Sequence, residues 1–76
     1  MIISNIEHYS IDDNGSDGIV TWFTMDLDGE QEMFGIHTDG ALLDGDGAPV
    51  TPGDELYRSV MYSIDQFAQE LQSKLF

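Results

Sequence analysis

The sequence predicts an α+β fold, with a three- or four-stranded antiparallel β-meander and one C-terminal α-helix packed on one face. Asp-Gly pairs begin at Asp17, Asp28 and Asp39, eleven residues apart each time, and Asp-Gly is a strong signal for a tight hairpin turn. The segments between the pairs are rich in β-branched and aromatic residues, which favour strands. Further along the chain, apolar residues recur at helical spacing.

The length and composition set the number of domains. With 76 residues, the chain can bury one modest core and is too short for a second domain. We therefore expect a single domain over residues 1–76, with an acidic meander over 1–50 and an amphipathic helix over 51–76. Because the sequence has no cysteine, its stability must come from packing, a metal or self-association, and either a monomer or a homodimer is expected.

Three strands are expected ahead of the helix. They cover Ile2–Ile11, Ile19–Leu27 and Glu30–Thr38. Two turn signals compete between the first two strands, Asn14-Gly15 and Asp17-Gly18. Ala41–Leu43 is a candidate short edge strand, and the glycine-rich segment that follows it is unsuited to continue a ladder.

The loop at Asp28-Gly29 decides which side chains of the central hairpin face the core. A two-residue turn pairs Phe23 with Phe34, whereas a three-residue loop places Trp22 opposite Phe34. We favour the two-residue turn, with Phe23 and Met25 facing inward. The same register places Glu30 and Glu32 beside apolar residues, and this unfavourable placement of two charged side chains argues against the two-residue turn.

The C-terminal segment predicts a helix from about Pro52 to Lys74. Thr51 supplies a capping hydroxyl, Pro52 suits a first turn, and the acidic residues that follow match the helix dipole. Its apolar residues fall on one stripe that we expect to pack on the sheet. The stripe contains Leu56, Val60, Ile64, Phe67, Leu71 and Leu75, and is widened by Tyr57, Met61 and Ala68.

Acidic residues are concentrated in the predicted meander. The net charge of −13 lies entirely ahead of Arg58, because Asp65 and Glu70 balance Arg58 and Lys74. Such a field repels nucleic acid phosphates and anionic lipids, so direct nucleic acid or membrane binding is not expected. The chain starts without a basic segment ahead of an apolar run, and no stretch approaches the roughly 18 apolar residues of a membrane span. We expect a cytoplasmic protein.

One interpretation of these carboxylates is mimicry of a nucleic acid backbone. Side chains two residues apart on one face of a strand are about 6.7 Å apart, a spacing comparable to that of phosphates along a nucleic acid strand. The ten candidate residues are Asp26, Asp28, Glu30 and Glu32 in a row around the second turn, Asp12, Asp13 and Asp17 at one end, and Asp39, Asp44 and Asp46 at the other. The expected partner is a basic protein whose nucleic-acid-binding groove is steered onto this surface.

Solubility and turn chemistry are a second interpretation of the same residues, and they account for the Asp of each Asp-Gly pair. A surface selected only for solubility mixes both signs of charge, however, because unrelieved repulsion destabilises the compact state. The absence of basic residues ahead of Arg58 therefore favours selection for one sign.

Calcium binding is a third interpretation. The segment Asp13–Gly18 begins like an EF-hand loop, but Gly15 occupies the third loop position and Thr24 the twelfth, where a bidentate Glu is needed. The Asp44–Gly47 segment has no defined ligand spacing. No metal and no other cofactor are expected.

Catalysis is not expected either. His8 and His37 are the only histidines, and no cysteine or recognisable nucleophile motif accompanies them. His37 is expected to be a surface or cross-strand residue. The glycines follow Asp residues instead of opening a helix, so they do not form a phosphate-binding loop.

The short length, the row around Asp28 and the Asp-rich turns resemble those of small acidic inhibitors made by phages and mobile elements, which include DNA-mimic anti-restriction and anti-CRISPR proteins. The resemblance implies an inhibitor that occludes the cationic site of a nucleic-acid-handling complex. Immunity proteins and antitoxins that cap a basic nuclease or toxin have similar sizes and charges. A non-inhibitory acidic domain, either halophilic or calcium-binding, is a further alternative, although halophilic adaptation would also acidify the outer helix face.

Overall fold

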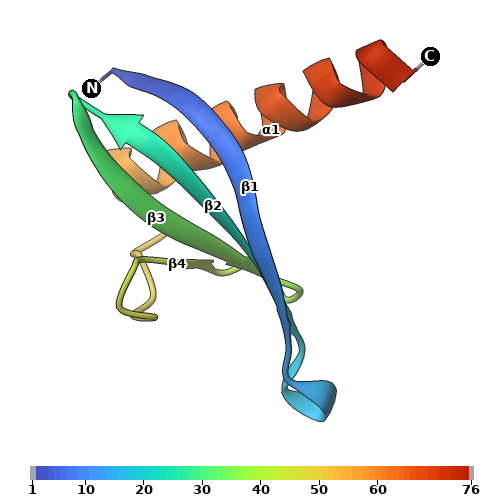
Figure 1. Ribbon diagram of the computed structural model, residues 1–76. Coiled ribbons are helices and arrows are strands. Elements are labelled where there is room, and N and C mark those ends of the chain that lie inside the picture. The colour runs from blue at the N-terminus through green and yellow to red at the C-terminus, as the bar shows by residue number, and fades with distance from the viewer. Residues whose placement is uncertain (1, 76) are drawn as a thin grey trace.

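The computed structural model describes residues 2–75, with the side chains of residues 2–72. Within these residues, four antiparallel strands form one sheet in the order β1-β2-β3-β4, and a long helix crosses one face of it (Figure 1). The elements are β1 (Ile3–Asp13), β2 (Ile19–Leu27), β3 (Glu30–His37), β4 (Leu42–Leu43) and α1 (Glu55–Leu75), with a 3-10 turn η1 (Gly15–Asp17) between β1 and β2. The predicted α+β fold class is confirmed.

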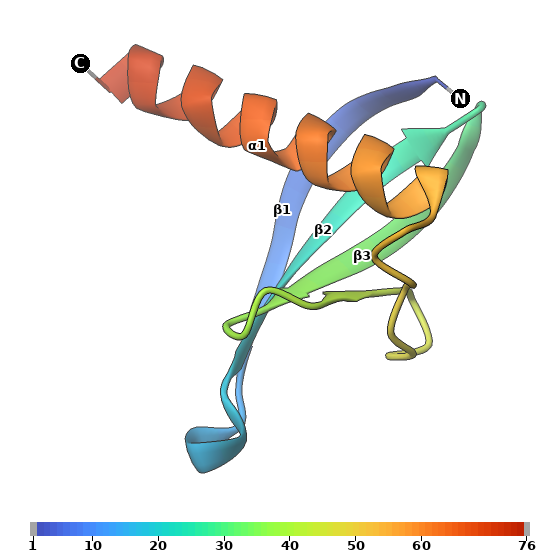
Figure 2. The ribbon, with the colours of Figure 1, turned by 180° about the vertical axis from the view of Figure 1, so that it is seen from behind.

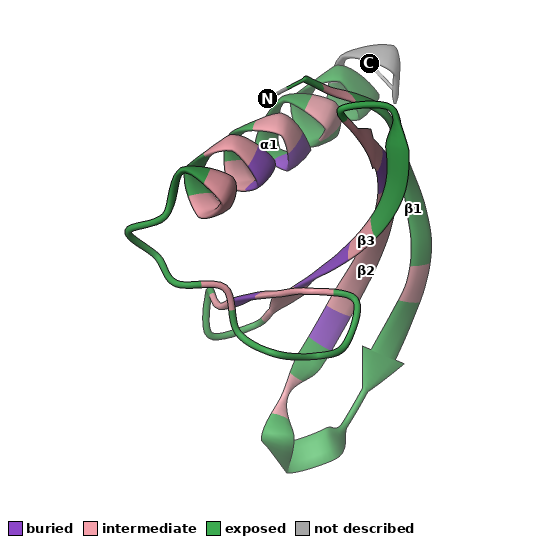
Figure 3. Cartoon of the chain, turned by 90° about the vertical axis from the view of Figure 1, so that its left-hand side faces the viewer, coloured by how far each residue is buried: buried purple, intermediate pink, exposed green. Residues whose placement is uncertain are grey.

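The core lies between the sheet and the helix. Its buried side chains are Met25, Phe34, Leu42, Val60 and Ile64. Phe23 extends the core along β2 by packing edge-on against Phe67, with a ring-centroid distance of 6.2 Å. Figure 3 shows that burial is concentrated where α1 and the sheet face each other, whereas most of β1 is exposed. The end of the β1–β2 hairpin projects away from the helix, past the rest of the sheet (Figures 1 and 2).

The Asp28-Gly29 turn sets the register of the sheet. Both residues have positive φ, +52° at Asp28 and +90° at Gly29, as a two-residue type I′ turn requires. The turn pairs Phe23 with Phe34, and Met25 on the same face is fully buried. The preferred register is therefore confirmed.

The same register places Trp22 on the sheet face that points away from the helix. Trp22 is opposite Gly35, and a Cβ atom on Gly35 would lie 2.8 Å from the indole ring and 2.7 Å from Val20. The absent side chain lets the indole lie against the β3 backbone and helps to bury Val20. Both faces of the sheet therefore carry apolar packing.

Two of the loops differ from the predicted two-residue turns. Between β1 and β2, neither of the competing pairs forms a turn alone, because Asn14 N–H donates to the Gly18 carbonyl at 2.9 Å and encloses η1. Between β3 and β4, His37 N–H donates to the Ala41 carbonyl at 2.9 Å. This leaves a three-residue loop that ends at Gly40 with φ +96°, the usual geometry of a hairpin with a left-handed last residue.

The helix begins later than expected. It starts at Glu55 and not at Pro52, because Asp54 N–H donates to the Thr51 carbonyl at 3.0 Å and closes a β-turn first. Proline is favoured at the second position of such a turn, so Pro52 serves the turn and not the helix. The expected Thr51 cap was wrong.

The apolar stripe of the helix covers the sheet only in part. Leu56, Tyr57 and Met61 pack against the core, as expected. Leu71 is 45% exposed, contrary to expectation, because the helix extends past β1 at this end (Figure 2). The predicted contact of Leu75 concerns a side chain outside the described residues.

Met25→Ala is expected to lower the free energy of unfolding by about 2–5 kcal/mol, because it opens a cavity in the centre of the core. Leu71→Ala is the matched control and is expected to cost less than about 1 kcal/mol. Urea unfolding followed by the fluorescence of Trp22 measures both. Equal losses in the two variants would contradict the described core.

Candidate partner-binding surface

The meander gathers the candidate carboxylates at its two ends. Successive hairpin loops lie at opposite ends of an antiparallel meander, so the β1–β2 and β3–β4 loops share one end and the β2–β3 turn occupies the other. We call Asp12, Asp13, Asp17 and Asp39 the loop-end carboxylates, and Asp26, Asp28, Glu30 and Glu32 the turn-end carboxylates. Asp44 and Asp46 lie apart from both, in the turn after β4, where Gly45 approaches the backbone of Met33.

This arrangement corrects one expectation. Asp17 and Asp39 were expected at opposite ends of the charge row, but their loops meet at His37. The His37 Nε2 atom lies 2.7 Å from the Asp17 carbonyl, and Nδ1 lies 3.1 Å from both the backbone nitrogen and the Oδ1 atom of Asp39. In the neutral ring, Nδ1 accepts from the Asp39 N–H and Nε2–H donates to Asp17.

His37 fits between the loops because Gly18 has no side chain. An added Cβ atom at Gly18 would lie 2.6 Å from the imidazole ring, and Gly18 has φ +103°, which disfavours other residues. His37 was expected to be a surface or cross-strand residue. Its role in joining the loops was missed because Asp17 and Gly18 approach it only once the sheet has formed.

The turn-end carboxylates do not form one row on one face. Paired residues in an antiparallel sheet share a face, and successive residues alternate between faces. Glu32 is opposite Met25 and Glu30 is opposite Leu27, so both project toward the helix side. Asp26 projects to the other side, with Trp22. These side chains therefore surround the end of the sheet.

Three carboxylates hold β1 against β2 through side-chain hydrogen bonds. Asp12 Oδ2 accepts from the Trp22 indole N–H at 2.9 Å. Asp26 Oδ2 accepts from the Asn5 amide at 2.6 Å, and Asp28 Oδ1 accepts from the Ile2 backbone N–H at 2.8 Å. These bonds fix the positions of the three carboxylates relative to the sheet.

Three more carboxylates stabilise their own loops by accepting nearby backbone N–H groups. Asp13 accepts from Gly15 at 2.9 Å, and Asp39 accepts from Ala41 at 2.8 Å. Asp44 Oδ1 accepts from both Asp46 at 2.9 Å and Ala48 at 3.0 Å. Turn chemistry is therefore confirmed as one role of the acidic residues.

All six of these carboxylates remain available for further contacts. Each uses only one of its two oxygens in the hydrogen bonds among the described residues. Nearly all the donors are neutral backbone, amide or indole groups, which orient a carboxylate without cancelling its charge. Among the described side chains, only the His37–Asp39 contact brings a basic group to a carboxylate, and it is an ion pair only when the imidazole is protonated.

The other four candidates have no side-chain hydrogen bond to the described residues, and all are exposed. They are Asp17, Glu30, Glu32 and Asp46. No charged side chain in the described chain is buried. The surface therefore combines six oriented carboxylates with four that are free to adjust.

Comparisons with models of protein families, with curated proteins and with solved structures find no match to this chain. Within residues 2–72, no three His, Asp or Glu side chains are grouped so that they would hold a metal ion. The described helix does not contain an apolar stretch long enough to cross a membrane.

The pKa of Asp39 lies below its usual value of 3.8. The main cause is the hydrogen bond that its carboxylate accepts from the Ala41 N–H, and His37 lowers the pKa further. A lowered folded-state pKa adds stability above the unfolded-state pKa, and this stability is lost as the pH falls through the folded-state value. We expect the stability difference between the wild type and Asp39→Asn to narrow in acid. Urea unfolding at a series of pH values measures it, and a difference that stays constant between about pH 5 and pH 2 would contradict this role.

Proposed function

We propose that this protein is an inhibitory binding protein, active in the cytoplasm, that occludes the cationic nucleic-acid-binding site of another protein. In this function the carboxylates stand in for phosphates and no chemical step takes place on the chain. The partner is a basic protein, either a nucleic-acid-handling enzyme or a complex that contains one.

One observation carries the proposal: each of the six bonded carboxylates has one oxygen without a hydrogen bond to the described residues, and all six are oriented mainly by neutral donors. A carboxylate already held in place loses less conformational entropy when a partner lysine or arginine contacts it. If these carboxylates only stabilised their turns through hydrogen bonds, the surrounding surface would not need an excess of negative charge. The near absence of cations among the strands leaves this excess uncompensated.

Two acidic ends on one small domain are also consistent with occlusion of a groove. The extents of the molecule are 32 × 31 × 21 Å, so both acidic ends lie on one body small enough to enter a groove of a larger protein. Charges placed at both ends of the sheet would contact opposite walls of a cationic groove. Such long-range attraction accelerates association and weakens with added salt.

The test is capture from a lysate of the source organism on the immobilised protein, followed by identification of the captured proteins. We expect nucleic-acid-binding proteins that are released by a short DNA duplex. A variant with Asp17→Asn, Glu30→Gln and Glu32→Gln removes three charges without removing a described hydrogen bond, and is expected to lower affinity for the captured protein by about tenfold or more.

The matched control removes three charges from the helix and its approach, through Asp54→Asn, Glu55→Gln and Asp65→Asn. It is expected to change the affinity less than about threefold. If the two variants lower the affinity equally, binding depends on the net charge of the protein and not on a localised surface, and the proposed site is rejected. A captured nuclease that is blocked at its catalytic step while it still binds DNA would reject occlusion of the nucleic-acid-binding site.

A further inference from the structure

The β1 strand forms a free edge of the sheet, since the order of the described strands begins with it. One side of an edge strand presents backbone N–H and C=O groups that no neighbouring strand satisfies. At eleven residues, β1 is the longest strand of the described sheet. It carries neither proline nor lysine, two residues that commonly block such an edge.

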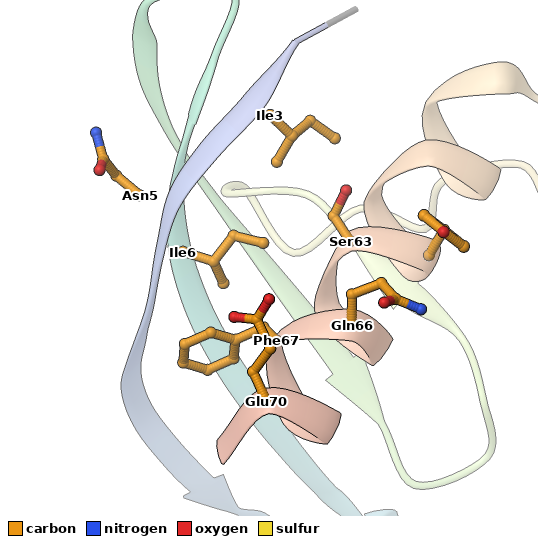
Figure 4. A pocket seen from close by; sticks show the side chains of 8 residues that line it. Ile3, Asn5, Ile6, Ser63, Gln66, Phe67 and Glu70 are labelled. Carbon is orange, nitrogen blue, oxygen red and sulfur yellow. The ribbon is translucent and has the colours of Figure 1, made fainter. Parts of the chain in front are cut away.

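A groove runs between this edge and the helix. It has a volume of about 440 Å³, within the range of sites that accept a small ligand or a few side chains. Ile3 and Ile6 point from β1 into the groove and Phe67 closes its floor, whereas Asn5 points to the other side of the strand (Figure 4). Gln66 and Glu70 of the helix form a polar and acidic wall.

Exposed apolar side chains concentrate along the same edge. Ile2, Tyr9 and Ile11 are 73%, 63% and 60% exposed, and they lie in or next to β1. Tyr62, 67% exposed, lines the groove from the helix. Four of the six large exposed apolar residues of the described chain therefore border one strand edge, a pattern typical of an interaction surface.

The charges around the edge define what binds there. Glu7 is paired with Thr24 and Asp12 with Val20, so both project from β1 on the face away from the helix. On the groove side, the apolar Ile3, Ile6 and Phe67 are bordered by polar side chains of the helix, among them Glu70. A strand added to β1 would thus have every second side chain on the groove side, near Ile3 and Ile6, and the others on the face that carries Glu7 and Asp12.

We propose that β1 and the groove bind a short extended segment of a partner protein, in which apolar and basic side chains alternate. Its backbone pairs with the edge of β1, its apolar side chains enter the groove, and its basic side chains lie on the face that carries Glu7. This mode of recognition adds a strand to a sheet. It goes beyond the proposed inhibitory function and does not require the loop-end or turn-end carboxylates.

A second copy of the chain is a poorer occupant. Each copy has a net charge of −13, and pairing of two β1 strands would bring these charges together. The register of β1 also shifts between Ser4 and Glu7 and between His8 and Ser10, and such bulges interrupt a long, flat edge. A basic segment is attracted instead of repelled, and a short one crosses fewer of the bulges than a second β1 strand would.

The experiment uses a capped peptide of six alternating valine and lysine residues as the probe, at physiological salt. We expect shifts of backbone amide resonances in β1 and along the groove in NMR spectra, and slower hydrogen exchange in β1. A block peptide with three valines followed by three lysines has the same charge and composition. It is expected to bind at least about fivefold more weakly, because its side chains cannot alternate between the two faces.

N-methylated probes separate backbone pairing from charge attraction. Successive N–H groups of a strand point in opposite directions, so methylation of the valine nitrogens and methylation of the lysine nitrogens block different edges of the peptide. We expect one of these probes to lose binding and the other to retain it. If both bind as well as the parent peptide, the strand-addition proposal is rejected.

Substitutions locate the site. Glu70→Lys and Tyr62→Ala are expected to weaken peptide binding by about fivefold each, whereas Asp65→Lys, which makes the same charge change as Glu70→Lys elsewhere on the helix, is expected to change it less than about twofold. The Asp17, Glu30 and Glu32 variant described above is also expected to leave peptide binding unchanged, so this inference and the proposed function can fail separately. The proposal would be overturned if the peptide shifted only the NMR resonances of the turn-end carboxylates. It would also be overturned if analytical ultracentrifugation showed a dimer of the protein that does not bind the peptide.

Discussion

The register fixed by the Asp28-Gly29 turn is the constraint on which the rest of the structure depends. A shift by one residue would move Met25 out of the core and turn Trp22 toward the helix. It would also separate Trp22 from Gly35, the residue whose missing side chain lets the indole lie against β3. Because both faces of the sheet carry apolar packing, a shifted register is penalised twice, and a small core is enough to specify one arrangement.

The parts of the fold that depend on local chemistry were predictable from the sequence. Asp-Gly favours the left-handed backbone of a two-residue turn. The bounds of β2 and the pairing of Phe23 with Phe34 could therefore be predicted from the sequence. The first residue of the helix could not be predicted, because Thr51-Pro52 suits a β-turn as well as a helix cap. The candidate carboxylates were identifiable by composition, but their grouping was not. His37 joins two loops that are distant in sequence, and the bulges in β1 depend on its pairing with β2.

The acidic residues serve the fold and remain available for binding because a carboxylate has two oxygens. One oxygen of Asp12, Asp28 or Asp44 holds a strand or a turn together, and the other makes no hydrogen bond to the described residues. The usual conflict between structural and binding roles is therefore avoided. The cost is mutual repulsion, which the hydrogen bonds from backbone and indole donors partly offset. A small domain without disulfides can hold many like charges in this way.

The bulges of β1 also affect how the protein behaves at high concentration. A long, flat and hydrophobic strand edge is a template for the stacking of identical chains into fibres. In β1 the ladder is interrupted twice, so two identical edges cannot align over their full length, and charge repulsion opposes their approach. A short foreign segment needs only a few residues of continuous edge. The edge thus distinguishes a partner from another copy of the chain, and an exposed interaction strand is compatible with solubility.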